Sequence, residues 1–307
     1  MRIVFMGTPE FAVPSLRILL ENDYEICGVV TAPDKPAGRG QQVSPSEIKV
    51  FASRYRLTIF QPEKLRDPEF VEALKSLRPE VFVVVAFRIL PPEVFTIPAR
   101  GAFNLHASLL PKFRGAAPIN WAIIRGEKET GVTTFFLKET VDTGNVILQA
   151  RVPIGENETA GELHDKLADV GAEIVLHSVR MIERGSATPK PQDDALASSA
   201  PKIFKEDCRI EWEKSAGEVH NFIRGLSPKP CAYTFHGDTS LKILRSGNVG
   251  HARRGAPGAI LQADDRLVVA ARDGVVEILE LQQEGKRKLP SSEFLRGYRL
   301  SAGDKLS

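Results

Sequence analysis

The sequence holds few cysteines and no long hydrophobic run. Only 3 cysteines occur among 307 residues, with no Cys-x-x-Cys pair, which argues against a disulfide-stapled scaffold and a zinc ribbon. The longest uninterrupted apolar run, at 81–87, is far shorter than the ~20 residues of a membrane span. The N-terminus also lacks the apolar segment and small-residue cleavage site of a secretory signal. We therefore expect a cytoplasmic protein that does not associate with a membrane.

Other absences narrow the function. The turn after the first expected strand reads Gly7-Thr8-Pro9, so it lacks the Gly-x-Gly-x-x-Gly pattern of a nucleotide-phosphate loop. No group of residues has the spacing of a metal site, and we expect no metal. The net charge of only +2 is the sum of two parts of the chain that differ in charge. Residues 1–200 carry 23 Lys and Arg against 25 Asp and Glu, whereas residues 201–307 carry 18 against 14. The more basic C-terminal third hints at a polyanionic partner.

The length and the 42% of hydrophobic residues are enough for about two globular domains. The first 188 residues alternate short apolar runs with amphipathic stretches, which predicts a Rossmann-like α/β fold with a doubly wound, mostly parallel sheet. The run at 81–87 is apolar on both faces, as a central parallel strand should be. Expected strands lie at 2–7, 24–30, 57–60, 81–87, 101–106 and 131–137, and expected helices at 11–20, 47–54, 67–77, 117–125 and 159–185.

The pattern changes after a stretch rich in Pro, Ser and Asp at 187–202, which is typical of a linker. We place the N-terminal domain at 1–188, the linker at 189–206 and the C-terminal domain at 207–307. After one expected helix, the C-terminal domain shows short strands separated by turns that contain Gly and Asp, a pattern that predicts a small β-barrel. These elements are the helix 215–226 and the strands 232–235, 241–244, 259–261, 267–270 and 275–281.

Candidate chemistry gathers at the end of one expected strand. Asn104 and His106 are two residues apart, so their side chains share a face of the strand. Asp142 follows 36 residues after His106, in a loop that could return its carboxylate to the same edge. An amide that donates to an oxyanion, an imidazole that moves a proton and a carboxylate that orients the imidazole suit acyl transfer. The residues alone also allow a structural alternative, in which His106 bonds a strand-end carbonyl and Asn104 caps a turn.

Four segments together resemble the folate-dependent formyltransferases. They are Asn104-Leu105-His106, the Ser-Leu-Leu-Pro segment at 108–111, residues 114–119 and Asp142-Thr143-Gly144. The resemblance implies that Asn104, His106 and Asp142 are catalytic and that the cosubstrate is 10-formyltetrahydrofolate. The implied contacts with the folate are made by Ser108, Leu109, Leu110 and Pro111.

The opening segment 6–12 and the loop 33–40 resemble the members of that family that formylate methionyl-tRNA. In those members the loop reaches the acceptor end of the tRNA, a role that the resemblance assigns here to Lys35 and Arg39. They also carry an OB-like barrel after a linker, which the C-terminal third resembles. The implied reaction is formyl transfer to the methionine of initiator Met-tRNA, for translation initiation, by a monomeric enzyme. The clusters Arg253-Arg254 and 286–288 are candidates for phosphate contacts.

Two alternatives stay open. A formyltransferase of the same fold could act on another amine, such as glycinamide ribonucleotide or an amino sugar nucleotide, and would then show no transfer to Met-tRNA. A non-enzymatic RNA-binding protein would bind tRNA without moving a formyl group. One departure from the family also stands out. Phe87-Arg88 follows the central strand where Tyr-Gly is usual, so the path of that loop and the role of Arg88 need a structure.

Overall fold

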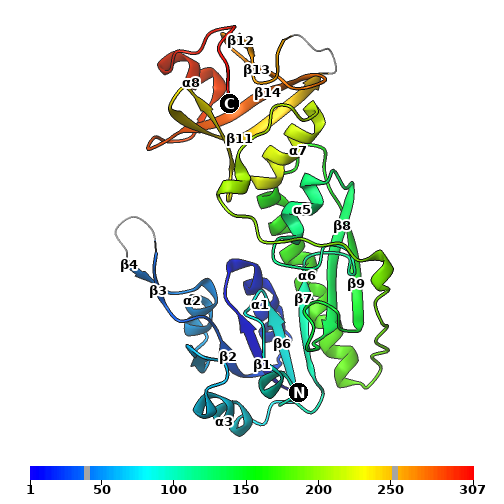
Figure 1. Ribbon diagram of the computed structural model, residues 1–307. Coiled ribbons are helices and arrows are strands. Elements are labelled where there is room, and N and C mark those ends of the chain that lie inside the picture. Colours follow the sequence, from blue (N-terminus) through cyan, green and yellow to red (C-terminus); the bar gives the residue numbers. More distant parts are fainter. Residues whose placement is uncertain (38–41, 251–254) are drawn as a thin grey trace. The chain divides into compact units, whose positions relative to one another are not determined.

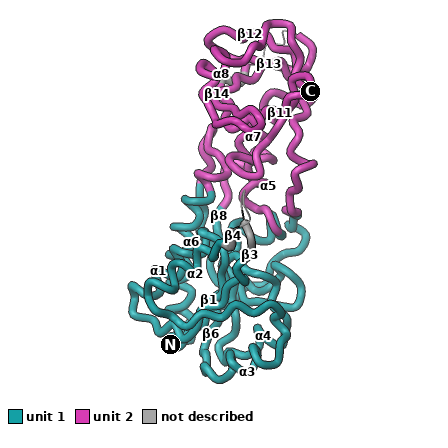
Figure 2. The backbone as a smooth tube through the Cα atoms, turned by 90° about the vertical axis from the view of Figure 1, so that its left-hand side faces the viewer, with its two compact units in different colours: residues 1–115, 131–152, 164–199 teal, residues 116–130, 153–163, 200–307 magenta. Residues whose placement is uncertain are grey.

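The computed structural model describes residues 1–37, 42–250 and 255–307, and the chain forms two compact units (Figure 2). The first unit comprises residues 1–115, 131–152 and 164–199, and the second comprises residues 116–130, 153–163 and 200–307. Each unit therefore gathers segments that are distant in the sequence.

The first unit is built on a seven-stranded sheet, ordered β5-β2-β1-β6-β7-β8-β9 (Figure 1). The first five strands in this order are parallel, and β8 runs antiparallel to β7. This arrangement confirms the predicted Rossmann-like, mostly parallel sheet. Its strands are β1 (Arg2–Gly7), β2 (Glu25–Val30), β5 (Ile59–Phe60), β6 (Val81–Val85), β7 (Ala102–His106), β8 (Glu129–Phe136) and β9 (Val146–Pro153).

Helices cover both faces of this sheet. On one face, α3 and α4 pack against the side chains of Val4, Met6, Phe82 and Val84. On the other face, α6 approaches so closely that a Cβ at Gly171 would lie 2.7 Å from the Leu105 side chain. The helices are α1 (Val13–Glu21), after a 3-10 turn at Glu10–Ala12, α2 (Glu47–Arg54), α3 (Pro68–Ser76), α4 (Pro92–Phe95) and α6 (Ala160–Glu183).

The alternation along β7 fixes where the candidate residues point. Ala102 belongs to the core beneath α3 and α4, and side chains two residues apart share a face. Asn104 and His106 therefore point to the face of α3 and α4, whereas Leu105 points to α6. Their strand pairs in register with both neighbours, with Asn104 opposite Val84 of β6 and Phe135 of β8. Two neighbouring strands thus hold the pair in place.

The segment after β2 forms a two-stranded ribbon rather than the loop that the sequence predicts. β3 (Lys35–Ala37) pairs antiparallel with β4 (Gln42–Ser44), beside α2 in Figure 1. At its base, Asp34 accepts a hydrogen bond from Lys49 Nζ at 2.5 Å and one from Gln61 Nε2 at 2.8 Å. These bonds hold the pKa of the Asp34 carboxyl below its usual value. The ribbon is thus anchored to α2 and to the residue after β5.

The second unit contains a curled antiparallel sheet, which confirms the small β-domain predicted for the C-terminal third. The strand order is β10-β11-β14-β13-β12, with β15 paired to β14. Trp212 is buried in the core that this sheet shares with α7, and its Nε1 donates to Thr234 Oγ1 at 3.1 Å. The elements are α5 (Pro118–Ile124), α7 (Ala216–Leu226), β10 (Ala232–His236), β11 (Thr239–Gly250), β12 (Ile260–Ala263), β13 (Leu267–Ala270), β14 (Val275–Gln283), β15 (Leu289–Pro290) and α8 (Ser291–Gly297).

Candidate active site

Asn104 and His106 lie at the carboxyl end of β7, the edge at which open α/β sheets bind ligands. His106 is buried, and Asn104 is half-buried. Within the part of the chain that the structure describes, the Asn104 amide has no hydrogen-bond partner. Its donor is therefore available to a ligand.

The surroundings of His106 fix the role of each ring nitrogen. Nε2 lies 2.9 Å from the carbonyl oxygen of Phe113, and because a carbonyl only accepts, Nε2 carries a hydrogen and donates it. Nδ1 lies 3.9 Å from Asp142 Oδ2, which is ion-pair range but too long for a hydrogen bond. Nδ1 is therefore the ring nitrogen that can face a reacting group, and it lies beside a carboxylate. The structure brings His106 and Asp142 together, as the sequence predicts.

Asp142 lies in the loop between β8 and β9 and has the left-handed backbone conformation, with φ +58°. Aspartate tolerates this conformation better than most residues do. Its carboxylate, with 12% of the side chain exposed, accepts a hydrogen bond from Gly115 N at 2.9 Å. Two residues later, a Cβ at Gly144 would lie 1.5 Å from Phe136 O, so only glycine fits there. The conformation of the loop is therefore constrained at the Asp142 carboxylate by Gly115 and two residues later by the close approach of Gly144 to Phe136.

The predicted folate segment 108–111 is held by β8 and β9. The Thr133 hydroxyl donates to Ser108 O at 2.6 Å and accepts from Leu110 N at 3.1 Å. Gln149 Nε2 donates to Leu110 O at 2.8 Å, and a Cβ at Gly131 would lie 2.6 Å from Leu109. The Leu110–Pro111 peptide bond is cis. Sequence reasoning missed Thr133 and Gln149, because a polar residue in a strand gives no signal of the loop that it supports.

β6 ends at Val85, whereas the expected strand continued to Phe87. The strand stops there because Ala86 has φ +47°. Arg88 turns toward the residues after β5 and donates from Nη1 to Glu63 O at 3.0 Å and from Nη2 to Pro62 O at 2.8 Å. Burial lowers the pKa of the Arg88 guanidinium. Arg88 therefore fastens two loops at the carboxyl edge of the sheet, which answers the question that the sequence left open.

Only part of the predicted tRNA-binding set can be located. Lys35 begins β3, whereas Arg39, Arg253 and Arg254 lie outside the described residues. The cluster 286–288 is exposed between β14 and β15, with Lys288 Nζ 3.2 Å from Glu280 Oε1. Over residues 1–37, 42–250 and 255–307, no group of three or more His, Cys, Asp or Glu side chains could hold a metal ion. Over the same ranges, no helix is long and apolar enough to cross a membrane.

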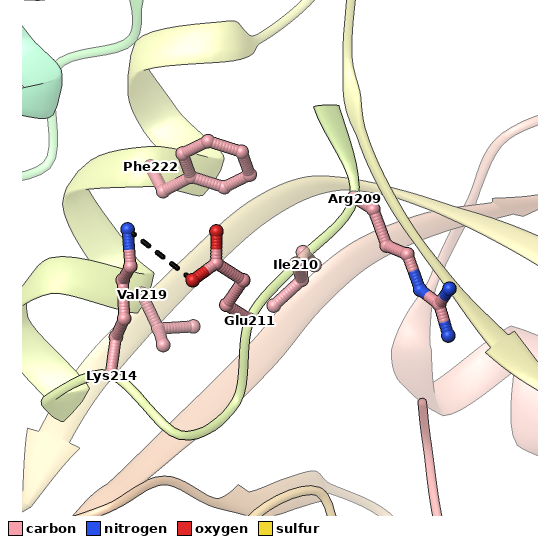
Figure 3. Close-up of a pocket in the computed structure, with 6 residues that line it drawn as sticks. All are labelled: Arg209, Ile210, Glu211, Lys214, Val219 and Phe222. Atoms are coloured by element: carbon pink, nitrogen blue, oxygen red, sulfur yellow. Dashed lines mark ion pairs between the residues drawn. The ribbon is translucent and has the colours of Figure 1, made fainter. Parts of the chain in front are cut away.

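A hollow in the second unit holds none of the predicted site residues (Figure 3). The apolar side chains of Ile210, Val219 and Phe222 line it together with Arg209, Glu211 and Lys214. Lys214 Nζ lies 3.6 Å from Glu211 Oε2, so these two charges neutralise each other. We assign no catalytic role to this hollow.

Comparisons with family models and with curated relatives show the family. The model of "Formyl transferase" matches residues 1–179, and that of "Formyl transferase, C-terminal domain" matches residues 202–299. A methionyl-tRNA formyltransferase of Caldanaerobacter subterraneus is 48% identical over 305 residues, 99% of each chain. One of Porphyromonas gingivalis is 48% identical over 313 residues, 98% of this chain and 97% of the other.

A similar fold occurs in the structure of WlaRD, a sugar 3N-formyltransferase crystallised in the presence of dTDP and 5-N-formyl-THF. Its TM-score is 0.69 at 24% identity, and the match covers 94% of this chain and 99% of that one. The two family models and the full-length relatives account for both units. The chain therefore belongs to the formyl transferase family.

Proposed function

We propose that this protein transfers the formyl group of 10-formyltetrahydrofolate to the α-amino group of methionine on initiator Met-tRNA. The observation that carries the proposal is the His106–Asp142 pair at the carboxyl edge of the sheet, together with an Asn104 amide that has no partner among the described residues. The full-length similarity to two methionyl-tRNA formyltransferases supports Met-tRNA as the acceptor over other amines.

The proposed reaction begins when the neutral amine of methionine attacks the formyl carbon. A carbon–nitrogen bond forms, and the carbonyl electrons move to the oxygen. The Asn104 amide and the protonated Nδ1 of His106 donate to this oxyanion, since Nε2 is already bonded to Phe113 O. Collapse of the adduct breaks the bond to the folate nitrogen, which takes up a proton, while the amine loses one.

Asp142 has two proposed tasks in this scheme. Its carboxylate, 3.9 Å from Nδ1, pairs with the imidazolium that donates to the oxyanion and keeps the ring oriented. It also helps to remove the amine proton through a water molecule. No step requires a nucleophilic Ser or Cys, because the acceptor brings its own amine.

The remaining site residues belong to the same proposal. Ser108, Leu109, Leu110 and Pro111 lie against the folate, a role that suits a segment fixed by Thr133 and Gln149. Lys35, which begins β3, and Arg39 contact the acceptor end of the tRNA. We propose that the enzyme is cytoplasmic and acts as a monomer without a metal.

The decisive experiment is a formyl-transfer assay with purified protein and 10-formyltetrahydrofolate. Four acceptors are compared: initiator Met-tRNA, elongator Met-tRNA, glycinamide ribonucleotide and an amino sugar nucleotide. We expect transfer to initiator Met-tRNA well above the other three. Preferred transfer to either small amine would overturn the proposal, as would tRNA binding without transfer.

A further inference from the structure

Part of the stretch predicted as a linker, residues 190–199, runs along the candidate active site and contains a 3-10 turn at Asp194–Leu196; we call this segment the strap. It begins with Lys190, whose backbone pairs with Val146 through hydrogen bonds of 2.7 and 2.9 Å. Between residues 191 and 199, only Gln192 and Ser198 are half-buried, and all the others are exposed. The two inward residues are those that touch the catalytic loops.

Gln192 uses both ends of its amide to join two loops. Its Nε2 donates to Asp142 O at 2.8 Å and to Gly144 O at 2.9 Å. Its Oε1 accepts from Arg114 Nε at 3.1 Å and from Arg114 Nη2 at 2.7 Å. Gln192 thereby ties the loop that carries Asp142 to Arg114. The residue after Arg114 is Gly115, whose backbone N–H donates to the Asp142 carboxylate. Because Asp142 has a left-handed backbone, outside contacts are needed to hold it there.

Ser198 fixes the carbonyl that orients the imidazole. Phe113 O accepts from His106 Nε2, and it shares a planar peptide unit with Arg114 N. Arg114 N donates to Ser198 O at 2.8 Å, so one side of this peptide is bonded to the strap and the other to His106. Phe113 N also donates to Ser198 Oγ at 2.9 Å. The strap therefore controls the direction of the Phe113 carbonyl.

We propose that the strap sets the geometry of His106 and Asp142, with Gln192 as the positioning residue for the carboxylate. This inference rests on the proposed function, since it assigns a task to residues around the same site. Gln192 itself touches no reacting atom; it acts through the backbone of Asp142 and Gly144. A displacement of about 1 Å at a catalytic group can cost about 100-fold in rate.

The test compares Gln192→Glu with wild type and with Asp194→Asn. Glutamate keeps the shape and the acceptor for Arg114, but it turns an oxygen toward two carbonyls that only accept. We expect kcat to fall by about 10- to 100-fold with KM for both substrates within about two-fold. Asp194→Asn removes only an exposed ion pair to Arg114, at 2.7 Å with Asp194 81% exposed, and should leave kcat unchanged.

A second readout does not depend on activity. Exchange of the Gly115 amide hydrogen, which bonds to the Asp142 carboxylate, should accelerate by about 10-fold or more in Gln192→Glu but not in Asp194→Asn. A milder variant, Gln192→Asn, shortens the side chain by one methylene group and serves if Gln192→Glu fails to fold. Wild-type kcat and wild-type exchange in the folded variant would overturn the inference and leave the proposed function intact. Failure of wild-type protein to formylate Met-tRNA would overturn the proposed function, while the exchange measurement would still decide on the strap.

Discussion

At the scale of single residues, the site is defined by what each polar atom already bonds. Asn104 has no partner for its amide among the described residues, whereas each nitrogen of His106 faces an acceptor oxygen. A carbonyl holds Nε2 at 2.9 Å, and a carboxylate faces Nδ1 at 3.9 Å. Nε2 is therefore committed to the Phe113 carbonyl, and Nδ1 is the nitrogen that lies next to Asp142.

Replacing Asn104 by alanine tests the proposed oxyanion donor. Because the amide bonds nothing in the described protein, Asn104→Ala should leave the melting temperature unchanged. Loss of one oxyanion donor should lower kcat by about 10²–10³-fold with little effect on KM. Steady-state formylation and a thermal melt check both parts. A variant with near-normal kcat would remove Asn104 from the catalytic set.

Asp142→Asn separates charge from shape. Asparagine also tolerates the left-handed backbone, and its amide oxygen can still accept from Gly115 N. The loop should persist while the negative charge beside His106 disappears, so kcat should fall by about 10²-fold or more. Measured kcat for Asp142→Asn, with Glu139→Gln as the matched control in the same loop, decides this. Equal losses in both variants would contradict a specific role for Asp142.

The residue pattern predicted part of this site and missed the rest for a physical reason. Two residues on one strand share a face, so Asn104 and His106 could be paired from the sequence. For Asp142 the residues showed only a loop carboxylate that could return to the same edge, and the family resemblance supplied its catalytic role, because a partner from a distant loop has no periodic signal. Gln192 gave no signal at all, since it bonds the backbone of Asp142, 50 residues away, and the side chain of Arg114, 78 residues away.

At the scale of elements, capping was predictable and irregular pairing was not. Thr159 and Glu162 have the spacing of a capping box and form one: Thr159 N donates to Glu162 Oε2 at 2.8 Å, and Glu162 N donates to Thr159 Oγ1 at 3.3 Å. The short pair β3–β4 was missed, because its strands of three residues include Pro36 and carry no alternation. β6 ends at Val85, two residues before the end of the strand expected at 81–87. The cause is the positive φ of Ala86, which an apolar run cannot reveal.

Glu162 gives this cap a defined pH dependence. Burial raises the pKa of its carboxyl, but hydrogen bonds from Arg245 and from the Thr159 amide and hydroxyl outweigh burial and lower it to about 2. A depressed pKa adds stability that is present above the ordinary value of 4.5 and is lost as the pH falls toward 2. Since the Glu162 side chain is 47% exposed, the screened contribution is about 1 kcal/mol or less.

Glu162→Gln isolates the charge, because glutamine can still complete a capping box. The variant should melt about 1–3 °C below wild type at pH 7, and this difference should vanish between pH 4.5 and pH 2. Thermal melts across that range measure it. Glu173→Gln, on an exposed position of the same helix, serves as the control and should show no such trend. A difference that grows as the pH falls would contradict the assigned ion pair.

At the scale of the whole molecule, the small net charge hides two basic regions that belong to different units. One is the sequence segment 33–40, which contains Lys35 and Arg39, and the other is the C-terminal third with its exposed cluster 286–288. Binding of a polyanion releases counterions in proportion to the phosphates contacted, so affinity for tRNA should depend on salt far more than affinity for folate does.

Arg39→Ala tests whether the segment 33–40 contacts the tRNA. Loss of a phosphate contact should lower kcat/KM for Met-tRNA and reduce the slope of log KM against log salt by about 1, while KM for the folate stays unchanged. Lys75→Ala removes one positive charge from the exposed end of α3 and provides the matched control. If both variants lose equally, the effect is one of net charge alone. If Arg39→Ala keeps its full kcat/KM and salt slope, this segment does not contact tRNA, and recognition must rest on the second unit.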